Sequence, residues 1–295
     1  MPGGRALLLT STCELARYDI ATASLDVSFG TNGLVSLALG GKCESLLRTP
    51  NGRLVALAVT SAQQRIARVL DSGVLDPGYD VALARDDEWS IDAVGRMLVL
   101  SSDNVVRRLN AFGAPDPSFA PTPLPTLVRR GFAAKIAGLA NGALVVGAES
   151  RPGVEAFHQL AALHVGPSGG LLSSTALAPF LTSSYDNQAP TWVLAFPSGS
   201  ALLAIEDYQS EARTTHGALV QLAAPAFPGG PWRPTSLATS DGFRTPSFEV
   251  DGSLLVGTFS SAHNAPHSCG LLRVDATSHV VTQARVGPDR DYPSC

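Results

Sequence analysis

A short turn that contains a glycine, followed at once by an apolar strand, recurs six times along this chain. The glycines stand at positions 4, 52, 95, 142, 199 and 252, so the steps between them are 48, 43, 47, 57 and 53 residues. A repeat of about fifty residues built from strands and turns is typical of a β-propeller. The spacing therefore predicts an all-β fold, a six-bladed β-propeller in which each repeat contributes one four-stranded antiparallel blade.

The composition agrees with one β-propeller domain over residues 1–295. Of these residues 45% are apolar, while 28 Gly and 21 Pro interrupt the apolar runs, so we expect almost no helix. No apolar run reaches the roughly 18 residues that a membrane-spanning helix needs. Only 16% of the residues are charged, the net charge is -4, and no long block carries one sign. This charge pattern argues against a nucleic-acid surface.

An arginine followed eight or nine residues later by an aspartate, and then by an aromatic residue, forms a second repeat. A guanidinium that binds a carboxylate would fix the corner between two strands, and an aspartate also favours a turn. The aromatic ring would anchor neighbouring blades. Three copies at one phase of the repeat favour a structural role over a catalytic one. The three sets are Arg17, Asp26 and Phe29; Arg68, Asp76 and Tyr79; and Arg108, Asp116 and Phe119.

The sequence around these residues resembles the bacterial delta-60 β-propeller repeat. The resemblance rests on Leu-Ala-Arg-Tyr at residues 15–18 with Ser-Leu-Asp-Val-Ser-Phe-Gly at 24–30. Related copies lie at residues 66–69 with 73–79, and at residues 106–109 with 113–119. It covers residues 1 to about 150, and the later repeats keep the apolar strand but lack the Leu-Asp-x-x-aromatic element. The resemblance implies a propeller fold whose later blades are diverged copies.

Each repeat is expected to run from an inner strand to the rim of the propeller. The inner strands are predicted before the glycine turns, at residues 43–47, 89–93, 134–139, 192–196 and 247–250. The chain opens on a second-position strand at residues 5–10, so the first blade lacks its inner strand. We expect residues 290–295 to run beside residues 6–9 and to close the ring, which removes the exposed sheet edges.

The four cysteines occupy matching places in two repeats. Cys13 and Cys269 stand just before a third strand, while Cys43 and Cys295 lie in or beside an inner strand. Four cysteines allow three pairings, and the repeat phase favours Cys13 with Cys43 and Cys269 with Cys295. Disulfides form in oxidising compartments, so we expect an extracytoplasmic protein (periplasmic, cell-surface or secreted) whose leader is absent from this chain. Reduced, cytosolic cysteines are the alternative.

Candidate ligand-binding residues are few. Trp89 and Trp192 begin inner strands and Lys135 lies in another, so these three would face the central funnel. For the tryptophans, packing between inner strands is the competing interpretation. His263 and His267 are metal-ligand types, but Pro266 between them prevents a helix, and an exposed loop is the favoured interpretation. No cofactor is expected.

These observations predict a non-enzymatic, extracytoplasmic propeller. It would be a monomer that binds a protein or carbohydrate partner through one face or through the funnel, where the loops converge. The alternative is a secreted hydrolase or lyase with its active site in the funnel. That alternative requires Lys135, an acid such as Asp92 or Glu249, and a histidine to lie within hydrogen-bond reach of one another.

Overall fold

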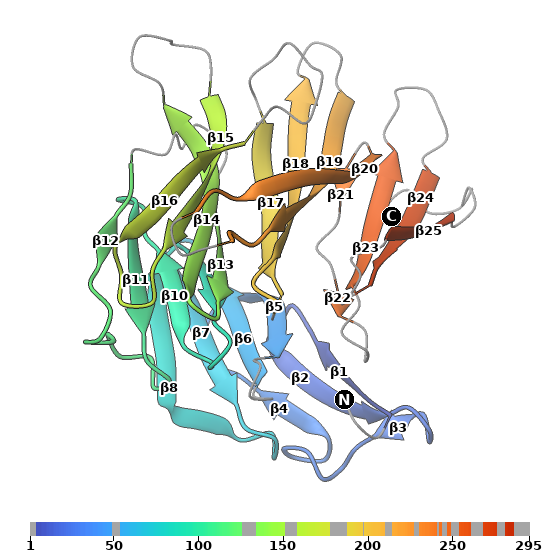
Figure 1. The fold of residues 1–295 in the computed structure, drawn as a ribbon. Helices are drawn as coiled ribbons and strands as arrows, with labels where there is room; N and C mark the ends of the chain where they lie inside the picture. Colours follow the sequence, from blue (N-terminus) through green and yellow to red (C-terminus); the bar gives the residue numbers. More distant parts are fainter. Residues whose placement is uncertain are drawn as a thin grey trace. The chain divides into compact units, whose positions relative to one another are not determined.

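The computed structural model describes residues 4–48, 54–125, 134–150, 158–177, 188–196, 198–209, 214–226, 230–240, 242–243, 247–248, 254–260, 268–275 and 281–285 (Figure 1). Within these ranges the chain forms strands and turns and no helix, as expected. No helix that could cross a membrane is therefore found in the described part of the chain. The chain divides into two compact units, Met1–Phe119 and Ala120–Cys295. That residues 1–295 form one domain stays a prediction.

The first unit holds antiparallel sheets in chain order. In the first sheet, β2 pairs with each of the other three strands. The second sheet runs β5-β6-β7-β8, and in the third β10 lies between β9 and β11. The strands are β1 (Arg5–Leu9), β2 (Glu14–Asp19), β3 (Ser24–Leu25), β4 (Leu34–Ser36), β5 (Lys42–Arg48), β6 (Leu54–Val59), β7 (Gln63–Val69), β8 (Leu75–Ala84), β9 (Glu88–Ile91), β10 (Met97–Leu100) and β11 (Val105–Leu109).

The second unit continues the same pattern. Two four-stranded sheets run β13-β14-β15-β16 and β17-β18-β19-β20, and in the last sheet β23 pairs with β21, β22 and β24, which in turn pairs with β25. The strands are β12 (Thr122–Pro123), β13 (Lys135–Leu139), β14 (Gly142–Ser150), β15 (His158–Val165), β16 (Leu171–Ala176), β17 (Gln188–Ala195), β18 (Ala201–Gln209), β19 (Thr214–Ala223), β20 (Arg233–Ser240), β21 (Gly242–Phe243), β22 (Ser247–Phe248), β23 (Leu254–Ser260), β24 (Ser268–Val274) and β25 (Val281–Arg285).

Middle strands of these sheets contain fully buried stretches, because neighbouring sheets of one unit pack face to face. All four residues of β10 are buried, as are residues 201–205 of β18. In the first unit, Ile66 of the second sheet packs with Met97 of the third. In the second unit, Leu144 packs with Leu203 of the following sheet. The apolar runs after the glycine turns therefore supply the core.

The described glycines of the repeat take backbone conformations that favour glycine. Four of the six lie in described residues, and each stands within two residues of the start of a strand or begins one. A positive φ is free of steric cost for glycine because it has no Cβ. Gly52 and Gly252 lie outside the described residues. The φ values are +64° for Gly4, +86° for Gly95, +137° for Gly142 and +85° for Gly199.

Several predicted inner strands agree with the structure, whereas ring closure is not tested. The predictions at 43–47, 89–93, 134–139 and 192–196 overlap β5, β9, β13 and β17, each of which is followed by its antiparallel neighbour. Residues 290–295 lie outside the described residues, so their pairing with residues 6–9 stays a prediction. Among the described strands, β1 pairs with β2 alone.

A close approach between two turns makes Gly73 sensitive to substitution. Gly73 has a φ of +85°, and a Cβ there would lie 2.4 Å from the amide nitrogen of Gly30. The same Gly30 N–H donates to the carbonyl oxygen of Ser72 at 2.8 Å, so the two turns are in direct contact. Neither turn has room for an added methyl group.

Gly73→Ala is expected to lower the free energy of unfolding by about 2 kcal/mol, since left-handed backbone strain adds to overpacking. Gly40→Ala is the matched control, because Gly40 also has a positive φ (+70°) but no atom lies within 4 Å of an added Cβ. This control should lose about 1 kcal/mol from backbone strain alone. Urea denaturation measures both values, and equal losses would contradict the close approach.

Candidate functional site

Each of the three predicted arginines binds the aspartate of its own corner. The distances from Nε to the aspartate Oδ2 are 2.9 Å for Arg17 and Asp26, 2.9 Å for Arg68 and Asp76, and 2.7 Å for Arg108 and Asp116. All three arginines are buried. Their guanidinium carbons lie 4.5, 4.4 and 4.7 Å from the ring centroids of Phe29, Tyr79 and Phe119, which is cation–π distance.

Two of these arginines also reach the following sheet. Arg17 Nη1 donates to the carbonyl oxygen of Asp71 at 2.8 Å, and Arg68 Nη1 donates to that of Ala111 at 2.5 Å. Asp71 lies in the β7–β8 turn, and Ala111 follows β11. Each guanidinium thus joins a carboxylate, an aromatic ring and a neighbouring turn. The corners act as structural connections between consecutive sheets.

Hydrogen bonds at these corners stabilise ionised aspartates. The hydroxyl and the N–H of Ser118 donate to Asp116 Oδ1 at 2.7 and 2.9 Å. With the help of Arg108, they lower the pKa of Asp116 from 3.8 to about 2. Asp26 is held in the same way: the hydroxyl of Ser28 donates to Asp26 Oδ1 at 2.5 Å, and this hydrogen bond lowers the pKa of Asp26. Both carboxylates are ionised at neutral pH.

We expect the free energy of unfolding to decline as the pH falls from about 4 to about 2. A carboxyl group whose folded pKa is depressed stabilises the fold above its unfolded pKa of 3.8, and this contribution is lost as the pH falls through the folded pKa. Urea denaturation across this range measures the decline. In Asp116→Asn the free energy of unfolding should fall less steeply with decreasing pH. An identical pH dependence would contradict a stabilising role for the ionised Asp116.

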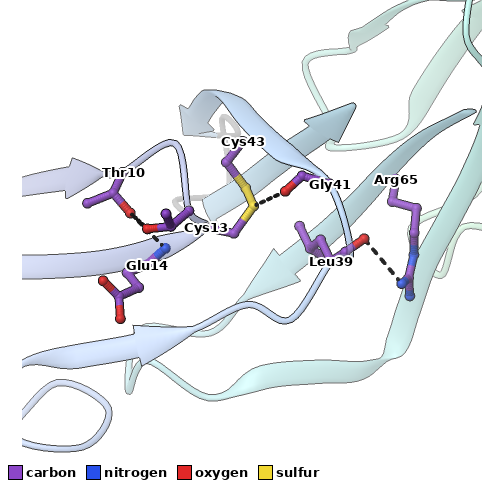
Figure 2. The surroundings of a disulfide bond; sticks show 8 residues. Thr10, Cys13, Glu14, Leu39, Gly41, Cys43 and Arg65 are labelled. Carbon is purple, nitrogen blue, oxygen red and sulfur yellow. Dashed lines mark hydrogen bonds between the residues drawn. A yellow bond between two sulfur atoms is a disulfide. The ribbon is translucent and has the colours of Figure 1, made fainter. Parts of the chain in front are cut away.

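The structure contains the predicted disulfide between Cys13 and Cys43 (Figure 2). Cys13 lies in the turn before β2 and Cys43 lies in β5, so the bond joins the first sheet to the second. The Cα atoms are 5.0 Å apart, and both cysteines are buried. Cys295 and the side chain of Cys269 lie outside the described residues, and their pairing stays a prediction.

The two tryptophans of the predicted funnel site pack in apolar clusters. Trp89 is partly buried against a cluster that includes Val55 and Met97. Trp192 is only 7% exposed and packs with Phe196 and Val256. These contacts favour the packing interpretation. Trp89 belongs to the first unit, whereas Trp192 and the partly buried Lys135 belong to the second. A shared ligand site for the three stays a prediction.

Asp92, one of the two acids considered for a catalytic funnel, has a structural partner. Asp92 is 2% exposed, and its Oδ2 accepts a hydrogen bond from Arg96 Nε at 2.7 Å. Its Oδ1 accepts from the backbone N–H groups of Val94 and Arg96, so Asp92 caps its own turn. Glu249 and the weak metal candidates His263 and His267 lie outside the described residues. In the part of the chain that is described, no three His, Cys, Asp or Glu side chains gather as a metal site.

A pocket of 340 Å³ lies in the second unit, at the turn ends of sheets β13–β16 and β17–β20. Hydrogen bonds hold the two sheets together beside it. The hydroxyl of Thr175 accepts a hydrogen bond from the backbone N–H of Trp232 at 3.1 Å, and the hydroxyl of Ser173 donates to the carbonyl oxygen of Gly230 at 3.3 Å. The described residues that line the pocket are Leu139, Ala140, Asn141, His164, Ser198, Gly199, Ala224, Pro225, Ala226 and Trp232.

His164 is the polar side chain of this pocket that most needs an explanation. It is 2% exposed, and neither ring nitrogen has a hydrogen-bond partner among the described residues. Its ring meets that of Trp232 edge-on, with centroids 5.9 Å apart at 67°, and the Trp232 Nε1 likewise has no described partner. Burial lowers the pKa of His164, so the imidazole is neutral at neutral pH.

Sequence reasoning did not single out His164 or Trp232. The available signal was a lone polar residue in the apolar run 160–165 of β15, a strand that is buried on both faces. Buried polar groups almost always have partners, so a histidine at such a position marks a place to examine. Trp232 lies 68 positions further along the chain, and no sequence period connects it to His164.

No family model and no curated protein sequence matches the chain. Among solved structures, an ulvan lyase of a polysaccharide lyase family is 10% identical, with a TM-score of 0.51 over 97% of this chain and 82% of that one. A proposed 6-phosphogluconolactonase from Bacteroides uniformis is 13% identical, with the same TM-score and the same coverage of both chains. The Dos1 propeller is 11% identical over 97% and 82%, with a TM-score of 0.47. At these identities the likeness concerns the fold alone, which in this chain is all-β and built of antiparallel sheets.

Proposed function

We propose that this chain is a six-bladed propeller of delta-60-like repeats, closed by its C-terminal segment, that binds a partner without catalysing a reaction. The repeat period and the Arg-Asp-aromatic corners support the architecture. The observation that carries the function is the pocket of the second unit, because its described lining contains no Asp, Glu, Lys or Arg and His164 is its one titratable side chain.

Binding agrees with this chemistry better than hydrolysis does. Glycoside hydrolysis uses a pair of carboxyl groups, and general acid–base catalysis needs a titratable group poised near the working pH. In the described lining, the single imidazole has no acidic neighbour to orient it. Asp92 accepts hydrogen bonds within its own turn. A carbohydrate or protein surface is the proposed partner class.

The test is to incubate the full chain, purified without reductant, with immobilised neutral and acidic glycans, and to assay the same glycans for new reducing ends. Saturable retention without bond cleavage is the expected result. Cleavage that scales with protein concentration and disappears in Lys135→Ala would overturn the proposal in favour of the hydrolase or lyase alternative.

We also propose an extracytoplasmic location, which the Cys13–Cys43 disulfide supports. Peptide mapping by mass spectrometry, on protein isolated from its native cells under non-reducing conditions with thiols blocked at lysis, tests this location. The expected products are the Cys13–Cys43 and Cys269–Cys295 cross-linked peptides. Four free thiols would show that the protein works in a reducing compartment.

A further inference from the structure

We propose that the pocket beside His164 and Trp232 binds one uncharged, hydroxyl-bearing ring, such as a single neutral sugar unit. The proposal rests on the binding function above and assigns it a location and a ligand class. This location differs from the predicted funnel residues, because none of Trp89, Trp192 and Lys135 lines the pocket.

The first step of the argument concerns unpartnered polar atoms. Both nitrogens of His164 and the Nε1 of Trp232 are buried without a hydrogen-bond partner among the described residues, and both side chains line the pocket. A buried polar atom without a partner raises the free energy of the folded state. A ligand that supplies the missing partners removes this penalty, so its binding is favoured.

The second step concerns the partners that these atoms require. A neutral imidazole offers one donor and one acceptor, and the indole offers a donor. The ligand must therefore supply two acceptors and one donor at neighbouring positions. Hydroxyl groups both donate and accept, so two adjacent hydroxyls on one ring meet the requirement. Asn141 and Ser198 add further polar groups to the lining.

The third step concerns charge, shape and size. The described lining holds no charged side chain that could neutralise an ion, and burying an unpaired charge is costly. Leu139, Pro225 and Trp232 supply apolar surface suited to the C–H face of a ring. A volume of 340 Å³ lies at the low end of about 300–1,000 Å³ for small-molecule pockets, which suits one ring.

Access to the nitrogens requires movement of a side chain or a loop, because the three atoms are covered. Residues 224–226 form one wall of the pocket, and Ala224 and Ala226 are exposed there. We therefore expect ligand entry to displace this wall or to rotate one of the two rings.

The test is isothermal titration of the full chain with methyl glycosides of glucose, galactose, rhamnose and N-acetylglucosamine, alongside glucuronate and glucosamine as charged probes. At least one neutral probe should bind saturably, and the charged probes should bind at least about tenfold more weakly. His164→Leu and Trp232→Phe should each weaken the neutral probe by about tenfold or more, because each removes hydrogen-bonding atoms and keeps most of the apolar volume. His164→Gln should recover part of the loss.

The matched comparison is Trp192→Phe. Trp192 also carries a buried indole N–H without a described partner in the same unit, but it does not line the pocket. Unfolding of every variant is measured first, so that a loss of binding is read only from folded protein. If the site is the pocket, Trp232→Phe should weaken binding of the neutral probe far more than Trp192→Phe does.

The outcomes separate this inference from the proposed function. If the immobilised glycans of the first test retain the chain but no monosaccharide probe binds, the pocket assignment is wrong and the binding function stands. If a probe binds, and Trp192→Phe alone weakens it, the site lies at the predicted funnel residues and the pocket is again excluded. If neither the immobilised glycans nor the probes bind and cleavage is found, both proposals fail.

Discussion

Arg68→Ala will lower the free energy of unfolding by about 3 kcal/mol, because it removes a buried guanidinium that binds the partly buried carboxylate of Asp76. Arg68 is 4% exposed, and its Nε and Nη2 donate to Asp76 Oδ2 at 2.9 and 2.6 Å. The substitution also removes the contact with the Tyr79 ring and the hydrogen bond to Ala111 in the following sheet. Urea denaturation monitored by circular dichroism measures the loss.

A matched control lies three residues away on the same strand. Arg65 binds Asp80 at 2.5 Å, but the side chains are 31% and 53% exposed. Exposed ion pairs contribute about 0–1 kcal/mol, so Arg65→Ala should lose little. Arg68→Lys should lose nearly as much as Arg68→Ala, because one ammonium cannot satisfy a carboxylate, a ring and a distant carbonyl together. Equal losses in Arg65→Ala and Arg68→Ala would contradict the corner as a source of stability.

Cys13→Ala combined with Cys43→Ala is expected to lower the free energy of unfolding by about 3–4 kcal/mol, measured in urea without reductant. The bond closes a chain segment with a sequence separation of 30, and its loss releases conformational entropy in the unfolded chain. It also frees the first sheet from the second at the turn before β2.

Wild-type protein in reductant is the control for this pair. Reduction removes the cross-link but keeps both sulfur atoms, so the difference between wild type and the double variant, both measured in the same reductant, reports the packing of the buried side chains. Most of the loss should already be present in reduced wild type. A reduced protein as stable as the oxidised one would show that the cross-link does not contribute to stability.

Features that depend on residues close together in the chain were predictable. The Arg–Asp corners span eight or nine positions, and the structure brings the members of all three pairs together. The glycine turns mark strand reversals because only a residue without Cβ adopts a positive φ freely. Repeat phase also favoured the bond between Cys13 and Cys43, because the same two positions, before a third strand and beside an inner strand, hold cysteines again at 269 and 295.

Features that depend on the packing of one sheet against the next were not predictable. The periodicity placed Trp192 at the start of an inner strand but did not decide between the funnel and the apolar cluster in which it packs. No pattern in the sequence indicated that Arg68 reaches Ala111, 43 positions away. Such contacts depend on how the turns of consecutive sheets meet.

The glycine turns, the corners and the apolar strands follow from local spacing, because turn chemistry and side-chain alternation act over a few residues. The pocket follows from the tertiary structure alone. His164 and Trp232 belong to different sheets of the second unit, and the packing of these sheets brings the two rings to 5.9 Å and buries them without partners among the described residues. Burial changes a histidine in an apolar strand into a candidate binding group, and burial is a property of the packed sheets.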